Sequence, residues 1–412
     1  MQRPAVEQKE LFTLVNQIFE EIRKDGDKAV VEYNNIFDKV DLEKLEVDEK
    51  QVKDASKNVS NELQNAIRLA KNNIEKFHAA QQHKKEVIET TKGVICWREN
   101  RAIENVGIYI PGGSAPLFST VLMLGVPAKL AGCKEIVLCT PPDKNGNINP
   151  AILYTARLVG VTKIFVVGGI QAIGALTFGT KSIPKVDKIF GPGNQYVTAA
   201  KQMALNFGVA IDMPAGPSEV LVIADDSANP EFVAADLLSQ AEHGADSQVI
   251  LLSDNQKIVE QTLQEIKKQV KVLTRQQIAE NALKNSKAIV LKSIDKCIEF
   301  SNEYAPEHLI LAVKKHSSYT KNIINAGSVF LGNYSCESAG DYASGTNHTL
   351  PTNGYARNYS GVSLDSFVKK ITFQELTKEG IQNIGPAIEL MAEAEQLMAH
   401  KNAVTVRLKD IK

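Results

Sequence analysis

The chain has 412 residues, of which 43% are hydrophobic and 23% are charged. These values are typical of a globular protein with a large core and about two to four domains. Its 47 basic and 48 acidic residues lack the basic excess of most nucleic-acid-binding proteins, so we expect no nucleic-acid partner.

The N-terminus lacks the apolar segment of a secretory signal, and no stretch approaches the ~20 apolar residues that span a bilayer. The five cysteines include no CxxC pair, which argues against a disulfide framework and against a cysteine zinc site. We therefore expect a cytoplasmic protein with reduced, mostly buried thiols and no membrane contact.

The first 85 residues are predicted to be helical. Apolar residues recur at helical spacing from Leu11 to Ile22 and again from Leu63 to Phe77. His78 and His83 fall in polar surroundings, so we expect both at the surface.

From residue 106 onward, short β-branched runs alternate with helical stretches. Strands are expected at 106–110, 135–139, 163–167 and 186–190, and helices at 116–131, 151–159 and 172–178. A second alternation places strands at 219–223, 248–252, 288–291 and 308–312, and helices at 230–242 and 255–267. Such alternation predicts two parallel α/β units in series.

The C-terminal third is less regular. Residues 333–363 are rich in Gly, Ser, Asn and Tyr and predict a long loop, which in a compact domain is usually functional. A helix is expected from Pro386, in its first turn, to His400, and a last strand at 403–408.

Gln240 and His243 stand three residues apart in a predicted helix that Gly244 ends, so their side chains would share one face. A neutral imidazole is a good zinc ligand, whereas a glutamine carbonyl is a rare one. Spacing alone therefore favours a helix-capping pair without a metal.

Three further positions combine an acid or a histidine with a structural break. Glu307-His308 follows Pro306 at the start of a strand, where the histidine is a natural general base or the two form a surface pair. Asp341 lies in a glycine-rich loop, where such an acid is often only a turn former. His400 ends a helix, where it would also complement the helix dipole.

Glycine turns at strand ends can present N–H groups to a phosphate. Gly168-Gly-Ile-Gln171 and Gly191-Pro-Gly-Asn194 are such turns, but neither matches GxGxxG. Tyr109 precedes another glycine turn, where its ring would flank a nucleotide or simply pack.

Seven segments together resemble the histidinol dehydrogenase family. They are Val106–Leu117, Phe190–Asn194, Ile211–Glu219, Asp236–Gly244, Glu303–His308, Ser338–Pro351 and Ala399–Ala403, and they span nearly the whole chain in family order. The chain departs from the family pattern in a short segment before Arg3-Pro4 and in an alanine at position 305. The first departure puts a small N-terminal domain and some dimer contacts in doubt.

The resemblance implies a zinc-dependent, NAD-linked oxidation of L-histidinol through L-histidinal to L-histidine, in which zinc positions the substrate. His308 would be the general base, and Glu307 would activate water. Zinc ligands would be Gln240, His243, Asp341 and His400. Substrate-binding residues would be Ser218, Gln240, His243, His308, Asp341, Glu395 and His400, with His348 near them. NAD would lie at Tyr109, Gln171 and Asn194.

For the fold, the resemblance implies two Rossmann-like parallel-sheet α/β domains, a helical N-terminal region and a small C-terminal helical tail domain. We expect residues 1–108 with 219–362 in one α/β domain, 109–218 in the other, and 363–412 in a tail that reaches the partner subunit of a homodimer.

Two other functions remain compatible with these residues. A zinc hydrolase of an amide or ester would use the same ligands with Glu307 as the base, and a regulatory protein would bind a nucleotide without catalysis. Mn²⁺ or Co²⁺ would also suit such a nitrogen and oxygen site.

Overall fold

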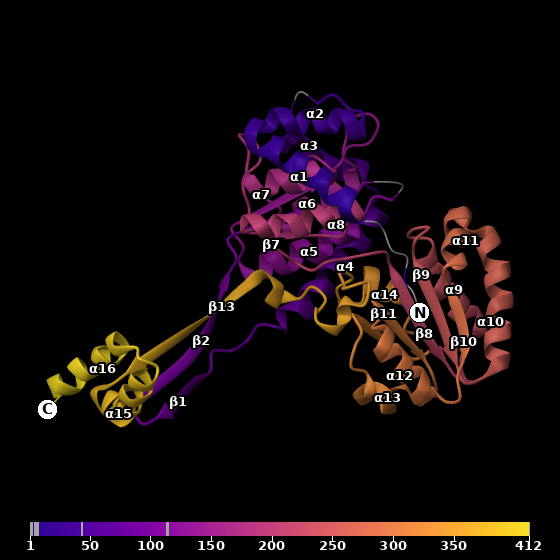
Figure 1. Ribbon diagram of the computed structural model, residues 1–412. Helices are drawn as coiled ribbons and strands as arrows, with labels where there is room; N and C mark the ends of the chain where they lie inside the picture. The colour runs from indigo at the N-terminus through magenta and orange to yellow at the C-terminus, as the bar shows by residue number, and fades with distance from the viewer. Residues whose placement is uncertain (1–2, 4–7, 43, 113–114, 412) are drawn as a thin grey trace. The chain divides into compact units, whose positions relative to one another are not determined.

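A computed structural model describes residue 3 and residues 8–42, 44–112 and 115–411. The chain forms two compact units, Met1–Ala80 with Ile103–Phe367 and Gln81–Ala102 with Val368–Lys412. Figure 1 shows the helices and strands of each.

The first large sheet has five parallel strands in the order β5-β4-β3-β6-β7. They are β3 (Asn105–Tyr109), β4 (Glu135–Thr140), β5 (Lys163–Val166), β6 (Lys188–Phe190) and β7 (Ala210–Ile211). They are connected by α5 (Phe118–Ala131), α6 (Pro150–Val159), α7 (Gly169–Phe178), α8 (Gln195–Ala204) and the short η2 (Leu205–Phe207). The strand order reverses between β3 and β6, and ligands of such sheets bind beyond the carboxyl ends of the strands at this point.

The second large sheet repeats this design, with the parallel order β10-β9-β8-β11-β12. Its strands are β8 (Glu219–Ala224), β9 (Gln248–Ser253), β10 (Lys287–Val290), β11 (His308–Ala312) and β12 (Ser328–Leu331). Its helices are α9 (Pro230–Ala241), α10 (Gln256–Gln269), η3 (Val270–Val272), α11 (Gln276–Lys284), α12 (Ile294–Tyr304), α13 (His316–Tyr319) and η4 (Thr320–Asn322).

Local sequence explains these elements well. β8, β9 and β11 are buried along their whole length, as continuous apolar runs should be when helices cover both faces of a parallel sheet. Asn229 and Asn255 cap α9 and α10 by accepting bonds from backbone N–H groups. The predicted pair of parallel α/β units is confirmed.

The N-terminal region is helical, as predicted. It comprises α1 (Gln8–Asp25), α2 (Asp27–Asp38), α3 (Glu49–Asp54), η1 (Ala55–Asn58) and α4 (Asn61–Ala79). Ile18 of α1 shares an apolar core with Ile173 of α7, and Ile74 of α4 shares one with Leu122 of α5. These helices therefore cover the first sheet, which differs from the expected grouping of residues 1–108 with 219–362.

His78 is buried, so its expected surface position was wrong. Its Nδ1 lies 2.8 Å from the Ile74 carbonyl oxygen and its Nε2 lies 3.3 Å from the Asn347 amide nitrogen. Because both ring nitrogens have partners, burial is tolerated despite the polar flanking sequence. His83 is exposed, as expected.

The second compact unit contains an antiparallel sheet that the sequence did not indicate. β2 (Val94–Ala102) lies between β1 (Val87–Thr91) and β13 (Val368–Leu376). β1 is exposed throughout, so it lacks the apolar alternation by which strands are recognised. The expected tail of residues 363–412 thus shares its compact unit with residues 81–102.

Two helices follow this sheet, α15 (Lys378–Ala394) and α16 (Met398–Ile411). The expected strand at 403–408 was wrong, and Pro386 lies inside α15 rather than in a first turn. Residues 403–408 are helical because Val404 and Leu408 pack against Gly385 of α15. Tertiary contact here overrides a β-branched sequence.

Residues 333–363 are less irregular than expected, because they include α14 (Glu337–Tyr342) and η5 (Tyr355–Arg357), with η6 (Leu364–Phe367) following.

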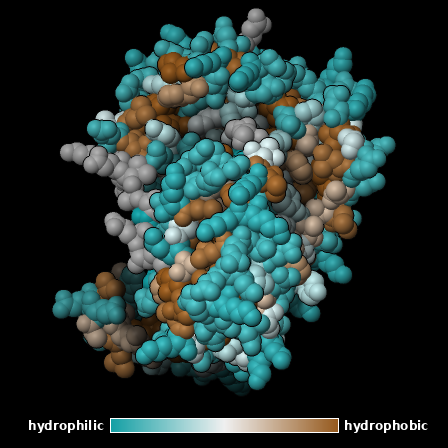
Figure 2. Space-filling view, turned by 90° about the vertical axis from the view of Figure 1, so that its right-hand side faces the viewer, coloured by the Kyte–Doolittle hydropathy of each residue, from teal (hydrophilic) through white to brown (hydrophobic). Residues whose placement is uncertain are grey.

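Cys133, Cys139 and Cys297 are buried, whereas Cys96 and Cys336 are half-buried, and all five are free thiols. Within the described ranges, no helix combines the length and apolarity needed to cross a membrane. The face drawn in Figure 2 is largely hydrophilic, with separate apolar patches.

Gly125 allows α5 and α6 to approach closely, since an added Cβ would lie 2.4 Å from Val159 Cγ2. Gly125→Ala is therefore expected to lower the free energy of unfolding by about 1–3 kcal/mol through overpacking, despite the higher helix propensity of alanine. Urea unfolding would measure the loss. Adding Val159→Ala should recover part of it, and an equal loss in both backgrounds would contradict the contact.

Candidate active site

His308 is the first residue of β11 and is 2% exposed. Its Nδ1 lies 3.1 Å from the Glu219 carbonyl oxygen and 3.6 Å from Glu307 Oε2. Its Nε2 lies 3.6 Å from Asp341 Oδ1. The imidazole is thus held between the neighbouring strand and two carboxylates.

Glu307 is also buried, and its Oε2 accepts two hydrogen bonds. The Glu219 N–H donates at 2.8 Å, and Gln240 Nε2 donates at 3.2 Å. Since β11 pairs in parallel with β8, the Glu307-His308 pair lies beside Glu219. Gln240 is brought there by α9, which runs back along the sheet from the end of β8.

This site lies at the amino ends of the strands of the second sheet. His308 and Glu219 are the first residues of β11 and β8, whereas most ligands of parallel sheets bind at the opposite edge. The usual rule would therefore have misplaced the site.

His243, Glu337 and Asp341 form a compact cluster, in which one potential ligand atom from each residue lies within 4.8 Å of the other two. The sequence predicted that His243 lies in the helix, but α9 ends at Ala241 and His243 lies in the turn that follows. Its N–H still bonds the Gln240 carbonyl at 3.2 Å. The pairing of Gln240 and His243 is therefore made by a turn.

Several polar atoms of this region are buried and have no hydrogen-bond partner among the described residues. They are Gln240 Oε1, His308 Nε2, Glu337 Oε2 and Asp341 Oδ1. Buried polar atoms nearly always have partners, so a group of four points to a ligand. These carboxylate and amide oxygens, together with the imidazole of the neighbouring His243, form a donor set that suits zinc or a similar cation.

The carboxylates also change the acidity of the cluster. Burial and the charge of Asp341 raise the pKa of Glu337, against the opposing effect of His308. Burial alone would lower the pKa of His308, but the charges of Glu307 and Glu337 raise it well above its ordinary value. Burial would raise the pKa of Asp341, but its contact with His308 holds that pKa below the usual range.

His348 links this cluster to the first α/β half of the unit. Its Nδ1 lies 2.9 Å from the Asp341 carbonyl oxygen and its Nε2 lies 3.0 Å from Thr120 Oγ1 of α5. Burial lowers the pKa of His348. Ser218 is half-buried and directly precedes Glu219.

Tyr109, Gln171 and Asn194 line one pocket of about 550 Å³. It lies at the carboxyl ends of β3 and β6, where the strand order reverses. The Tyr109 hydroxyl accepts a bond from the Gly169 N–H at 3.1 Å, and Asn194 caps α8. The structure thus brings together the three residues expected at a dinucleotide.

A buried ion pair holds the glycine turn that leads from β6 to Asn194. Lys201 pairs with Asp212, Lys201 Nζ donates to the Gly191 carbonyl at 2.7 Å, and Asp212 Oδ2 accepts from the Gly191 N–H at 2.8 Å. Gly191 has a φ of 129°, and a Cβ there would lie 2.1 Å from the Tyr109 carbonyl oxygen. Only glycine therefore fits this turn.

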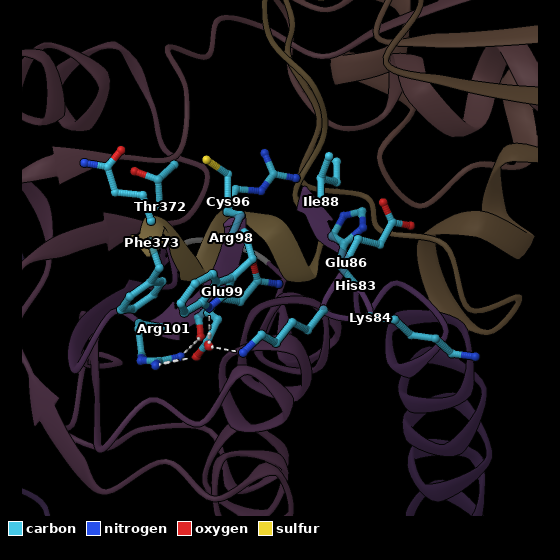
Figure 3. Close-up of a pocket in the computed structure, with 14 residues that line it drawn as sticks. His83, Lys84, Glu86, Ile88, Cys96, Arg98, Glu99, Arg101, Thr372 and Phe373 are labelled. Atoms are coloured by element: carbon cyan, nitrogen blue, oxygen red, sulfur yellow. Dashed lines mark hydrogen bonds and ion pairs between the residues drawn. The ribbon is translucent and has the colours of Figure 1, made fainter. Parts of the chain in front are cut away.

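Glu395 and His400 belong to the second compact unit, at the end of α15 and within α16, and both are exposed. Their part in the site stays a prediction. The same unit holds a pocket of about 1140 Å³ between β1, β2 and β13 (Figure 3), which no predicted site residue lines. Arg101 and Lys85 converge there on Glu99 and lower its pKa to about 2.

Comparison with known proteins decides the family. The family model described as histidinol dehydrogenase matches residues 1–408. The chain belongs to the histidinol dehydrogenase family. A histidinol dehydrogenase of Bacteroides fragilis is 60% identical over 412 residues, which cover all of this chain and 96% of that protein.

Solved structures agree with this assignment to the histidinol dehydrogenase family. The crystal structure of histidinol dehydrogenase from Elizabethkingia anophelis is 68% identical, with a TM-score of 0.98, and covers 100% of this chain and 95% of that one. A betaine aldehyde dehydrogenase from Staphylococcus aureus, 11% identical with a TM-score of 0.51 over 89% of this chain and 82% of its own, shares only the fold. The chain is therefore an oxidoreductase of the histidinol dehydrogenase family.

The sequence analysis did not identify Glu337, which the structure places beside His243 and Asp341, two of the expected ligands. Glu337 precedes Asp341 by four residues, so a helix would put both on one face. The Gly, Ser, Asn and Tyr content of residues 333–363 instead predicts a loop there.

Asp236 of α9 offers a test of electrostatics near the site, because burial raises its pKa from 3.8 to about 7. The folded chain favours the protonated acid, so this group's contribution to stability is full below pH 3.8 and is lost as the pH rises through 7. Asp236→Asn should raise the free energy of unfolding of the metal-free protein at pH 8 by about 2–4 kcal/mol.

The gain should fall to less than half at pH 5, as urea unfolding at both pH values would show. Asp246→Asn, at an exposed carboxyl between α9 and β9, is the matched control. A gain of equal size at both pH values would contradict the proposed cause.

Proposed function

We propose that this protein oxidises L-histidinol through L-histidinal to L-histidine, the last steps of histidine biosynthesis, with two molecules of NAD⁺ and one bound zinc ion. The observation that carries this proposal is the buried Glu307-His308 pair beside Gln240 and Asp341, whose Oε1 and Oδ1 atoms have no hydrogen-bond partner among the described residues. The pocket of Tyr109, Gln171 and Asn194 supports the use of a dinucleotide.

Gln240, His243 and Asp341 are the proposed zinc ligands in the first unit, and His400 is the proposed fourth. Bound zinc would supply charge stabilisation and a fixed anchor for the substrate. Glu337 lies close enough to His243 and Asp341 to be a further ligand or to orient them.

His308 is the proposed base of the first oxidation. It removes the hydroxyl proton of histidinol as the hydride on the same carbon leaves for NAD⁺. Its Nδ1 faces the Glu219 carbonyl and Glu307, which keep the ring oriented. Nε2, which has no hydrogen-bond partner among the described residues, is then the atom that receives the proton.

Glu307 is the proposed base of the second oxidation. It removes a proton from water as the water oxygen bonds to the aldehyde carbon, and the resulting hydrate gives its hydride to a second NAD⁺. The balance is one alcohol, one water and two NAD⁺ converted to one carboxylate, two NADH and three protons.

Ser218 and His348, together with Glu395 and His400, complete the proposed substrate site. We further propose that the protein is a cytoplasmic homodimer in which Glu395 and His400 act in the site of the partner subunit.

The direct test incubates the protein with L-histidinol and NAD⁺ and follows NADH absorbance with and without a chelator. Two NADH per histidinol, lost on chelation and restored by zinc, is the expected result. Hydrolysis of an amide or ester without NAD⁺ would instead favour a zinc hydrolase, and nucleotide binding without turnover would favour a regulatory protein.

The two bases should separate kinetically. His308→Asn is expected to slow histidinol oxidation by roughly 10²–10⁴-fold with zinc still bound, because it removes the proton acceptor. Glu307→Gln preserves shape and should mainly slow oxidation of supplied histidinal.

Stopped-flow measurement of each half-reaction, with metal content by atomic absorption, would check this division. Glu303→Gln, an exposed carboxylate four residues earlier, is the control and should match the unaltered protein. If Glu307→Gln slows both half-reactions equally, the separate role proposed for Glu307 is contradicted.

A further inference from the structure

Arg3 reaches into the second α/β half and binds Glu219 with two nitrogens. Arg3 Nε lies 2.5 Å from Glu219 Oε1, and Nη2 lies 3.1 Å from Oε2. Glu219 is 2% exposed, and among the described residues Arg3 is the cation that bonds it. A buried carboxylate is strongly destabilising without such a partner.

The same guanidinium also holds the segment that leads into β11. Arg3 Nη2 donates to the Tyr304 carbonyl at 2.7 Å, and the guanidinium carbon of Arg3 lies 3.9 Å from the centre of the Tyr304 ring. Tyr304 is followed by Ala305, whose φ of 54° is unfavourable for a residue with a Cβ. Arg3 therefore bonds the residue just before a strained turn.

Glu219 connects this clamp to the candidate bases through its main chain. Its N–H bonds Glu307 Oε2 at 2.8 Å, and its carbonyl oxygen lies 3.1 Å from His308 Nδ1. One guanidinium thus fixes the start of β8 through Glu219 and the approach to β11 through Tyr304. These are the two segments whose relative register sets the positions of Glu307 and His308.

We propose that Arg3 is a positioning residue for the Glu307-His308 pair, acting through Glu219 and the Tyr304 carbonyl. Arg3 contacts neither base directly. Its role in turnover rests on the proposed function, whereas its effect on the Glu219 backbone does not.

The test compares Arg3→Ala and Arg3→Lys with Arg357→Ala. Arg357 is the matched control, because it bonds the carbonyl and carboxylate of Glu303, next to Tyr304, but from the exposed side. Lysine keeps the charge but cannot bond both Glu219 oxygens and the Tyr304 carbonyl with a planar fork.

The first measurement is amide hydrogen exchange at Glu219 in the ligand-free protein. Exchange should become at least about tenfold faster in Arg3→Ala, less so in Arg3→Lys, and unchanged in Arg357→Ala. The second is the rate of histidinol oxidation, where kcat should fall roughly tenfold to a hundredfold in Arg3→Ala while the KM for NAD⁺ stays the same.

Unaltered exchange at Glu219 in both Arg3 variants would overturn the proposal. An unchanged kcat would also overturn it. So would a rise in the KM for NAD⁺ as large as the fall in kcat, because that would indicate a general loosening of the fold. If Arg3→Ala lowers the thermal transition temperature, the exchange rate and kcat of Arg3→Lys decide the proposal instead. Should the unaltered protein not oxidise histidinol, the proposed function fails, and the exchange result still decides the clamp.

Discussion

The candidate site is dominated by negative charge that the described part of the chain does not neutralise by itself. Glu307, Glu337 and Asp341 surround one buried imidazole, and two of their oxygens, Glu337 Oε2 and Asp341 Oδ1, have no hydrogen-bond partner among the described residues. Burying unpaired charge costs free energy, so a cluster of this kind indicates that a ligand binds there and offsets the cost. A cation among these oxygens would relieve the repulsion and also reduce the field that raises the pKa of His308. The proposed base would then be neutral nearer physiological pH.

The two candidate sites lie at opposite ends of the strands in two similar sheets. The pocket of Tyr109, Gln171 and Asn194 lies at the carboxyl ends of the strands of the first sheet, where helix N-termini and glycine turns provide N–H groups. The acid cluster lies at the amino ends of the strands of the second sheet, where side chains and the Glu219 backbone hold it. Arg3 and Thr120 show how distant segments of the same unit support those ends, through Glu219 and His348 respectively.

Periodicity predicted most of the two large sheets, because most of their strands are continuous apolar runs. It failed where contacts made far along the chain decide structure. β1 and β2 are too polar to be recognised, and residues 403–408 belong to a helix that packs beside α15. The resemblance to a known family supplied the site residues, whereas spacing alone left Gln240 and His243 open. Glu337 was missed because helix α14 was interpreted as loop, and the Arg3 clamp joins residues 216 positions apart, which local patterns do not report.

The most direct test of this account is the response of the metal-free protein to zinc. One equivalent of zinc should raise the thermal transition clearly, because it binds the folded state and removes the repulsion among buried carboxylates. Asp341→Asn should abolish most of that rise, whereas Asp246→Asn at an exposed carboxyl should leave it intact. A transition that zinc does not move, or that moves equally in Asp341→Asn, would contradict the central claim that this acid cluster is a metal site.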